Sequence, residues 1–255
     1  MQGALLIAEY RKLFDEMMAV YRVLETGMTP PQLVPAGAKG PMMRLPVQDA
    51  PHALLLKLAA LLSFLNGAIT LCEAGLVLAQ GAVERMADEA GEDVIFLSIG
   101  MIKGPTDRHA EFLDYFWRED FTDFDDPMNS LQSRPQVSRD KIRAAIHSIS
   151  DDPSAGNKAS KVLTKSYSGF VHAAAPHVME LYDAERKVFQ LDQAPRYRHK
   201  THQDDLWNYM YRGGTAVMFA ARAFDANGQV ERMRGGLQSF QDATGRDGGL
   251  RKKQA

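Results

Sequence analysis

Four of the seven histidines lie in two short stretches, and these stretches hold most of the side chains that could do chemistry. The first is KSYSGFVHAAAPHVMELYD, residues 165–183, and the second is RYRHKTHQDD, residues 196–205. Imidazole acts as a general acid or base near neutral pH and is also a common metal ligand. Catalysis and metal binding are therefore the two kinds of chemistry to weigh.

His199, His202 and Asp205 follow one another at intervals of three residues. On one continuous helix they would share a side, and with help from another helix they could hold a divalent transition metal. The alternative is that Thr201 caps a new helix, which leaves His199 outside it. The cap is the simpler interpretation, so we predict no metal site and no cofactor.

His172 and His177 are five residues apart, so on a regular helix their side chains point about 140° away from each other. They are a poor metal pair. The helical wheel leaves His172 on a polar stripe with Lys165, and Pro176 is expected to bend the helix. The same wheel predicts a core-facing stripe that includes Tyr167, Phe170, Val171 and Val178.

The composition is that of an ordinary globular protein, with 255 residues, 45% of them hydrophobic, and a net charge of −2. This net charge argues against electrostatic binding of nucleic acid by the protein surface as a whole, although a local basic patch remains an alternative. The single cysteine, Cys72, excludes an internal disulfide and any Cys-rich zinc site, and its apolar neighbours predict a buried, inert thiol. The first residues lack the pattern of a secretory signal, which favours a cytoplasmic location.

Hydrophobic periodicity predicts an all-α fold, a multi-helix bundle built round a long apolar helix at 54–81, and we find no strand alternation. Asp49, Thr106 and Ser138 are expected to start helices. The expected parts are an N-terminal helix at 1–27 that may dock on the rest, a Pro/Gly-rich connector at 28–50, a helical bundle at 51–243 and a flexible basic tail at 244–255. Further helices are expected at 83–99, 107–124, 138–149, from about 157 to 191, 201–224 and 230–240. The acidic run at 87–93 lacks the Glu-x-x-His pairs of diiron bundles, so we predict no diiron site.

The stretch 58–78 is also long enough to cross a membrane, at about 20 residues for one crossing. Asn66 and Glu73 lie on one face of it, and Lys57 comes just before. A carboxylate at mid-membrane is costly. We therefore favour a buried helix of a bundle, with the membrane as the alternative.

The segments EDVIFLSIGMIKGPTDRHAEFLDYFWREDF and KSYSGFVHAAAPHVMELY resemble those of an uncharacterised set of bacterial all-α proteins, similar to the HEPN superfamily. That superfamily includes toxin and phage-defence endoribonucleases, and the resemblance covers about 51–224. Its catalytic members resemble one another in an arginine followed, after four to six residues, by a histidine. Arg196 and His202 fit this spacing, with Pro195 expected to place the arginine in a loop, and Lys165 to His172 repeats the spacing with lysine.

The resemblance implies metal-independent cleavage of RNA by a homodimer. In that function His202 or His172 would transfer protons, and Arg196 would stabilise the charge of the phosphorane. The expected phosphate contacts are Lys165, Arg198, Lys200 and also Arg143. The alternatives are a non-catalytic helical interaction or scaffold protein and, third, a metal-binding helical bundle. The ribonuclease requires the side chains of Arg196, His202 and His172 to lie close together. The two alternatives do not.

Overall fold

The computed structural model describes residues 2–37, 40–149 and 151–247, and this part of the chain is mostly helical, as predicted. The helices are α1 (Gln2–Glu25), α2 (Ala50–Ala74), α3 (Val77–Lys103), α4 (Asp107–Trp117), α5 (Arg139–His147), α6 (Pro153–Val171), α7 (Ala175–Val178), the 3-10 turn η2 (Met179–Leu181), α8 (Arg196–Ala223) and α9 (Asn227–Thr244). Two hairpins that we did not predict accompany them: β1 (Gln32–Val34) with β2 (Met42–Arg44), and β3 (Tyr182–Asp183) with β4 (Val188–Phe189).

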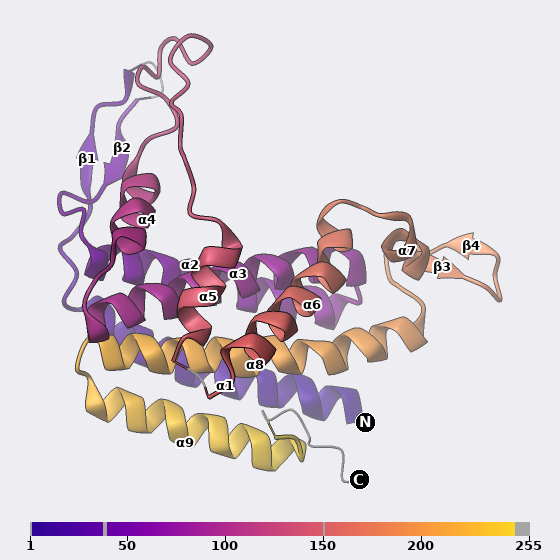
Figure 1. The fold of residues 1–255 in the computed structure, drawn as a ribbon. Coiled ribbons are helices and arrows are strands. Elements are labelled where there is room, and N and C mark those ends of the chain that lie inside the picture. Colours follow the sequence, from indigo (N-terminus) through magenta and orange to yellow (C-terminus); the bar gives the residue numbers. More distant parts are fainter. Residues whose placement is uncertain (1, 38–39, 150, 248–255) are drawn as a thin grey trace.

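The helix at the centre of the bundle is α3. It packs against α2 and α8, and also against α4, α5 and α6 (Figure 1). Helices α1 and α9 cover α8 from the other side. The prediction of one central helix at 54–81 is therefore wrong, because the apolar stretch is divided between α2 and the first turn of α3.

Gly75 divides that stretch. It ends α2 in the left-handed conformation, with φ 73°, and its N–H donates to the carbonyl of Cys72. Glycine adopts this conformation without the steric cost that a Cβ atom brings. The chain reverses there, so α3 runs back along α2 and both apolar faces are buried against each other.

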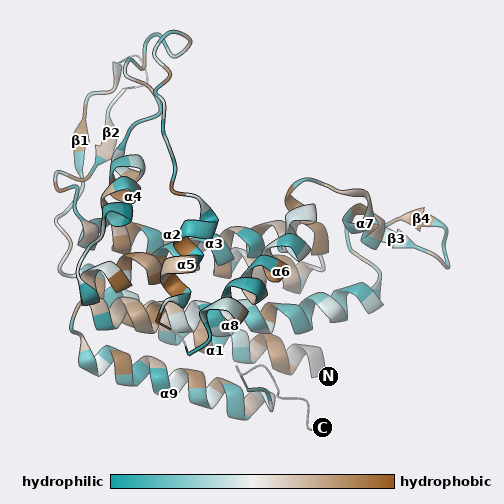
Figure 2. Ribbon diagram, viewed as in Figure 1, coloured by the Kyte–Doolittle hydropathy of each residue, from teal (hydrophilic) through white to brown (hydrophobic). Residues whose placement is uncertain are grey.

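Three polar side chains of α2, those of Asn66, Thr70 and Glu73, face α1. The guanidinium of Arg11 donates to Asn66 Oδ1 at 2.7 Å and to Glu73 Oε2 at 2.8 Å. By length and composition α2 is able to cross a membrane, and Figure 2 shows its apolar character. In this fold Leu58 and Leu65 are fully buried between helices, and the choice between membrane and cytoplasm stays a prediction.

The first helix and the connector are both integrated into the fold. Helix α1 buries Tyr10, Leu13 and Met17 against α2, α8 and α9. The connector forms the β1–β2 hairpin, whose Arg44 pairs with Glu119 beyond α4. Strands of three residues give too little alternation for the sequence to reveal them.

The predicted long helix up to 191 is wrong. Helix α6 ends at Val171, where His172 caps it and Ala173 turns the chain with φ 48°. Val171, predicted to be in the core, is half exposed for this reason. Residues 172–195 then form a projecting segment of α7, η2 and the β3–β4 hairpin, which we call the arm (Figure 1).

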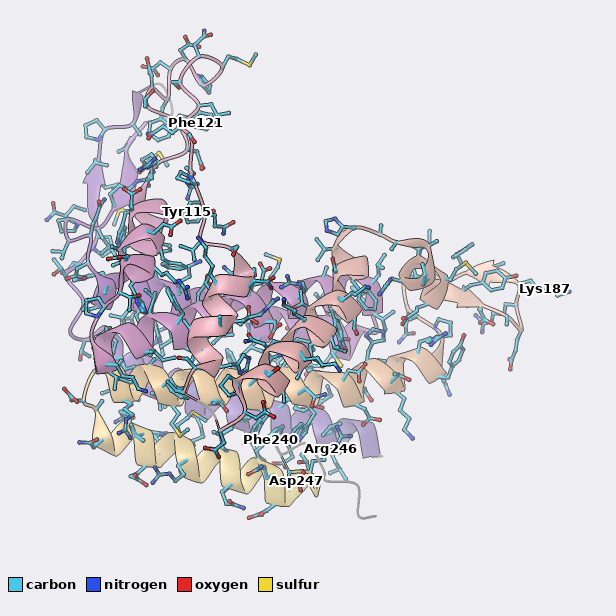
Figure 3. All side chains as sticks on the ribbon, viewed as in Figure 1. Tyr115, Phe121, Lys187, Phe240, Arg246 and Asp247 are labelled. Atoms are coloured by element: carbon cyan, nitrogen blue, oxygen red, sulfur yellow. The ribbon has the colours of Figure 1, made fainter. Side chains whose placement is uncertain are left out.

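The first residues of the tail that was predicted to be flexible, 244–255, contact α8. Trp207 Nε1 donates to Thr244 Oγ1 at 2.8 Å, and Arg246 donates to the carbonyl of Asp204 at 2.8 Å. Figure 3 shows Phe240, Arg246 and Asp247 at this end of α9. Residues 248–255 lie outside the described part of the chain.

Replacing Gly75 tests the reversal between α2 and α3. We expect Gly75→Ala to lower the free energy of unfolding by about 1–2 kcal/mol, because alanine is strained in the left-handed conformation. Urea denaturation measures this. The matched control is Gly235→Ala within α9, where a Cβ meets nothing within 4 Å. We expect this variant to raise the free energy of unfolding by about 0.5–1 kcal/mol. Equal effects of the two variants would contradict this account.

Candidate functional site

The predicted catalytic pair lies in the first two turns of α8. The helix begins at Arg196 and is continuous, so neither the predicted cap at Thr201 nor the predicted loop at Arg196 is present. Six positions apart, Arg196 and His202 lie about 120° apart round the helix. Arg196 is exposed and has no polar partner among the described residues, whereas His202 is buried. One protomer therefore does not bring the two side chains together.

His202 joins α8 to the arm. Its Nε2 lies 2.7 Å from Glu180 Oε2, and its ring meets that of Phe170 edge-on at 5.3 Å. Only 3% of His202 is exposed. Burial pushes the pKa of Glu180 upward, but the hydrogen bond and charge of His202, with the charge of Arg198, lower it below its ordinary value. The pair is therefore a contact between an imidazole and an ionised carboxylate.

The other predicted site residues lie outside this contact. His172 is exposed at the end of α6, about two helical turns beyond Lys165, which is also exposed. The guanidinium of Arg198 lies over the ring of Tyr197 at 5.2 Å. Lys200 is exposed on α8. The structure thus places the predicted histidines in different surroundings, one in solvent and one in the interior.

The three residues of the alternative metal site share a helix but not a site. His199 bonds the carbonyl of Cys72, His202 bonds Glu180, and Asp205 accepts from the Tyr167 hydroxyl. In the ranges that the structure describes, no group of three or more histidine, cysteine or acidic side chains is placed to hold a metal ion. These residues instead connect α8 to its neighbours.

The densest cluster of titratable groups lies on α3, and sequence reasoning missed it as a unit. Gln80, Glu84, Asp88 and Glu92 follow one another at intervals of four, and all are buried. With Asp93 they form what we call the acidic column. The four-residue spacing, which places side chains on one face of a helix, was the signal that could have found it.

Cations from three other helices neutralise the column. Asp88 pairs with Arg212 of α8 at 2.5 Å, and Glu92 pairs with Arg143 of α5 at 2.7 Å. Asp93 pairs with two cations, Lys57 of α2 at 2.8 Å and Arg139 of α5 at 2.6 Å. The column therefore fastens α2, α5 and α8 to α3.

Arg143 was predicted to contact RNA phosphates, and this is wrong. It is 3% exposed, and its guanidinium donates to Glu92 and, at 2.6 Å, to Thr164 Oγ1 of α6. A charge so placed cannot reach a phosphate without leaving Glu92 buried with only Arg139, 3.8 Å from its Oε2. Its role is to hold α5 and α6 on the column.

Glu84 pairs with no cation among the residues that the structure describes. Its Oε1 accepts from Gln80 Nε2 at 2.7 Å, and Gln80 also donates to the carbonyl of His202 at 3.0 Å. Burial raises the pKa of this carboxyl to about 8, so it is neutral at pH 7. The hydroxyl of Tyr167 is linked to Asp205 and to Tyr209. Gln80 thus joins the column to α8.

Cys72 is fully buried, as predicted, and burial raises the pKa of its thiol to about 12. The thiol is therefore not ionised at neutral pH and does not act as a nucleophile.

Taken together, the buried polar groups are arranged to join helices. Each carboxylate of the acidic column has a partner, and His202 is enclosed between Phe170 and Glu180. A substrate would reach His202 only if the arm moved away from α8. Comparisons with protein-family models, curated proteins and solved structures find no match to this chain. The HEPN resemblance therefore stays a prediction.

The raised pKa of Glu84 predicts a pH dependence of stability. Between the ordinary pKa of 4.5 and about 8, the folded protein holds a proton that the unfolded chain has released. The free energy of unfolding therefore falls as the pH rises through this window and levels off above it. Glu84→Gln keeps the shape and the bond from Gln80 but removes the titration. We expect the free energy of unfolding of Glu84→Gln to exceed that of the wild type by about 4–5 kcal/mol at pH 8.5 and to match it below about pH 4.

Urea denaturation of the wild type and of Glu84→Gln across this pH range measures the difference in unfolding free energy. The contributions of groups that titrate in both proteins cancel in this difference. A difference in unfolding free energy that is constant with pH would contradict the assignment.

Removing one partner of the Arg143–Glu92 pair tests the column. We expect Arg143→Ala to lower the free energy of unfolding by about 3–5 kcal/mol, because Glu92 stays buried without its hydrogen-bonded cation and keeps only Arg139, 3.8 Å from its Oε2. Lys161→Ala is the matched control: it breaks an exposed ion pair between α6 and α5, Lys161 with Asp140, and should cost less than about 1 kcal/mol. Similar losses in the two variants would show that the buried pair does not fasten α5 and α6 to α3.

Proposed function

We propose that the protein is a non-catalytic helical interaction protein that associates with a second copy of itself through the arm. The observation that carries this proposal is the group of large apolar side chains exposed on the arm and where it joins α6 and α8. About half or more of each is in contact with solvent: Val171, Met179, Val188, Phe189, Leu191 and Tyr197. Apolar side chains gathered in this way mark interaction surfaces.

The β3–β4 hairpin at the outer end of the arm has few contacts with the bundle. Its strands are two residues long, and the contact between the rings of Tyr182 and Phe189, at 5.2 Å, is the main packing across the hairpin. Isolated hairpins of this kind are marginally stable in water. Figure 3 shows Lys187 at the outer end, well away from the bundle. A second chain on the arm would bury the apolar side chains and support the hairpin.

The charges on the arm favour a copy of the same chain as the partner. Glu185 and Asp192 are exposed there together with Arg186 and Lys187. A two-fold contact brings the same patch of both subunits together, so a patch with both signs can be complementary to itself. Each acidic side chain of one arm can then face a basic one of the other.

The positions of the candidate catalytic groups support the non-catalytic part of the proposal. His202 is committed to Glu180, and Arg196 lies on another face of α8. A ribonuclease site, as the HEPN resemblance implies, would have to be completed across a dimer. Cleavage of RNA by the protein would therefore favour the ribonuclease over the non-catalytic interaction protein.

Light scattering after size-exclusion chromatography tests the association. We expect the wild type to be a dimer and Phe189→Ser with Leu191→Ser to be a folded monomer, because the two serines remove the apolar surface. The matched control is Leu33→Ser with Met43→Ser, which changes an equally exposed pair on the β1–β2 hairpin and should stay dimeric. A monomeric wild type, or dissociation of both variants, would overturn the arm as the interface.

Incubation with single-stranded RNA, with and without EDTA, tests catalysis separately. We expect no cleavage. Cleavage that persists in EDTA and is lost in His172→Ala or in Arg196→Ala would replace this proposal by the ribonuclease.

A further inference from the structure

An apolar cavity of about 330 Å³ lies at the end of the bundle where α3 and α8 finish and α9 begins. This volume is in the range of small-molecule sites. The apolar part of its wall comes from four parts of the chain: Ile99, Ile102, Ile149, Met218, Phe219 and Val230. It is distant along α8 from the arm, which lies beside the first turn of that helix.

The wall is graded from interior to solvent. Ile99 and Val230 are buried, Met218 and Phe219 are partly buried, and Ile102 is exposed. Open apolar surface of this kind is unfavourable in water, and its burial by a ligand is favourable. The cavity is therefore suited to an apolar group that enters from solvent.

Three cations, Lys103, Arg222 and Arg234, complete the lining, and none of the described lining residues is acidic. Arg234 pairs with Glu231 on its own helix. Lys103 and Arg222 form no ion pair or hydrogen bond with the residues that the structure describes. Both lie in the last turn of a helix, where a cation also stabilises the helix dipole. The experiment below separates this helix-stabilising role from ligand binding.

We propose that this cavity binds a small amphiphile with an aliphatic tail and a single carboxylate, of the class of medium-chain fatty acids. The tail would lie against Ile99 and Val230, and the carboxylate would meet Arg222 and Lys103 at the mouth. The planar guanidinium of arginine matches the two oxygens of a carboxylate. This site is independent of the proposed dimer, because its lining residues do not include any from the arm.

Isothermal titration calorimetry with decanoate, below its micelle concentration, tests the site on the full chain. We expect binding, with an affinity that rises about fourfold for each methylene added between hexanoate and decanoate. Decanol, which has the tail without the charge, is expected to bind at least tenfold more weakly than decanoate.

Two variants locate the site. We expect Arg222→Ala to weaken decanoate at least tenfold while leaving decanol unchanged, and Ile102→Trp to abolish both by filling the mouth. Because Ile102 is exposed, the second variant should fold normally, which its melting temperature checks. The matched control is Arg186→Ala in the arm, which removes the same charge elsewhere and should bind decanoate as the wild type does.

The proposal is overturned if decanoate does not bind, if decanol binds equally well, or if a folded Ile102→Trp keeps the wild-type affinity. An effect of Arg222→Ala on melting temperature without any effect on decanoate affinity would likewise overturn it, because Arg222 would then only stabilise its helix. The dimer test is unaffected by each of these outcomes, so the two proposals can fail separately.

Discussion

The acidic column of α3 is the constraint on which the rest of the fold depends. Burying Asp88, Glu92 and Asp93 in one helix is unfavourable unless each meets a cation, and an unpaired buried charge is among the most costly features a fold can contain. The cations come from α2, α5 and α8, so these helices can take only positions that bring them to the column. Apolar packing alone would allow more sliding between the helices than these pairs do.

Several side chains of types common in catalysis have structural contacts in the interior. Arg143 and Arg139 neutralise the column, and His202 connects α8 to Glu180. Glu84 adds a neutral carboxyl that accepts from Gln80. The buried polar groups thus have structural contacts, and the two proposed binding surfaces lie outside them, on the exposed arm and in the apolar cavity beyond the ends of α3 and α8.

Local sequence signals predicted the helices well where their cause is local. Asp49 caps α2 by accepting from the N–H of His52 at 3.0 Å, and Ser138 begins α5 in the same way. Thr106 starts α4 through a reciprocal contact with His109. Each depends on residues three positions apart, so the sequence alone contains the whole interaction. The ends of α2 and α6 were missed because Gly75 and Ala173 take positive φ in a context that the rest of the fold provides.

The sequence by itself determined the helical class, the caps at Asp49, Thr106 and Ser138, the buried thiol of Cys72 and the apolar character of α2, because these follow from residue type and spacing along one helix. Only the tertiary structure decided that Arg196 and His202 point apart, that Arg143 is buried, and that α3 and not α2 is central. The reason is physical: which charge meets which depends on helices far apart in the chain, as with Arg143 and Glu92. Hydrophobic periodicity shows which face of a helix must be buried, and the tertiary structure determines which other helix packs against that face.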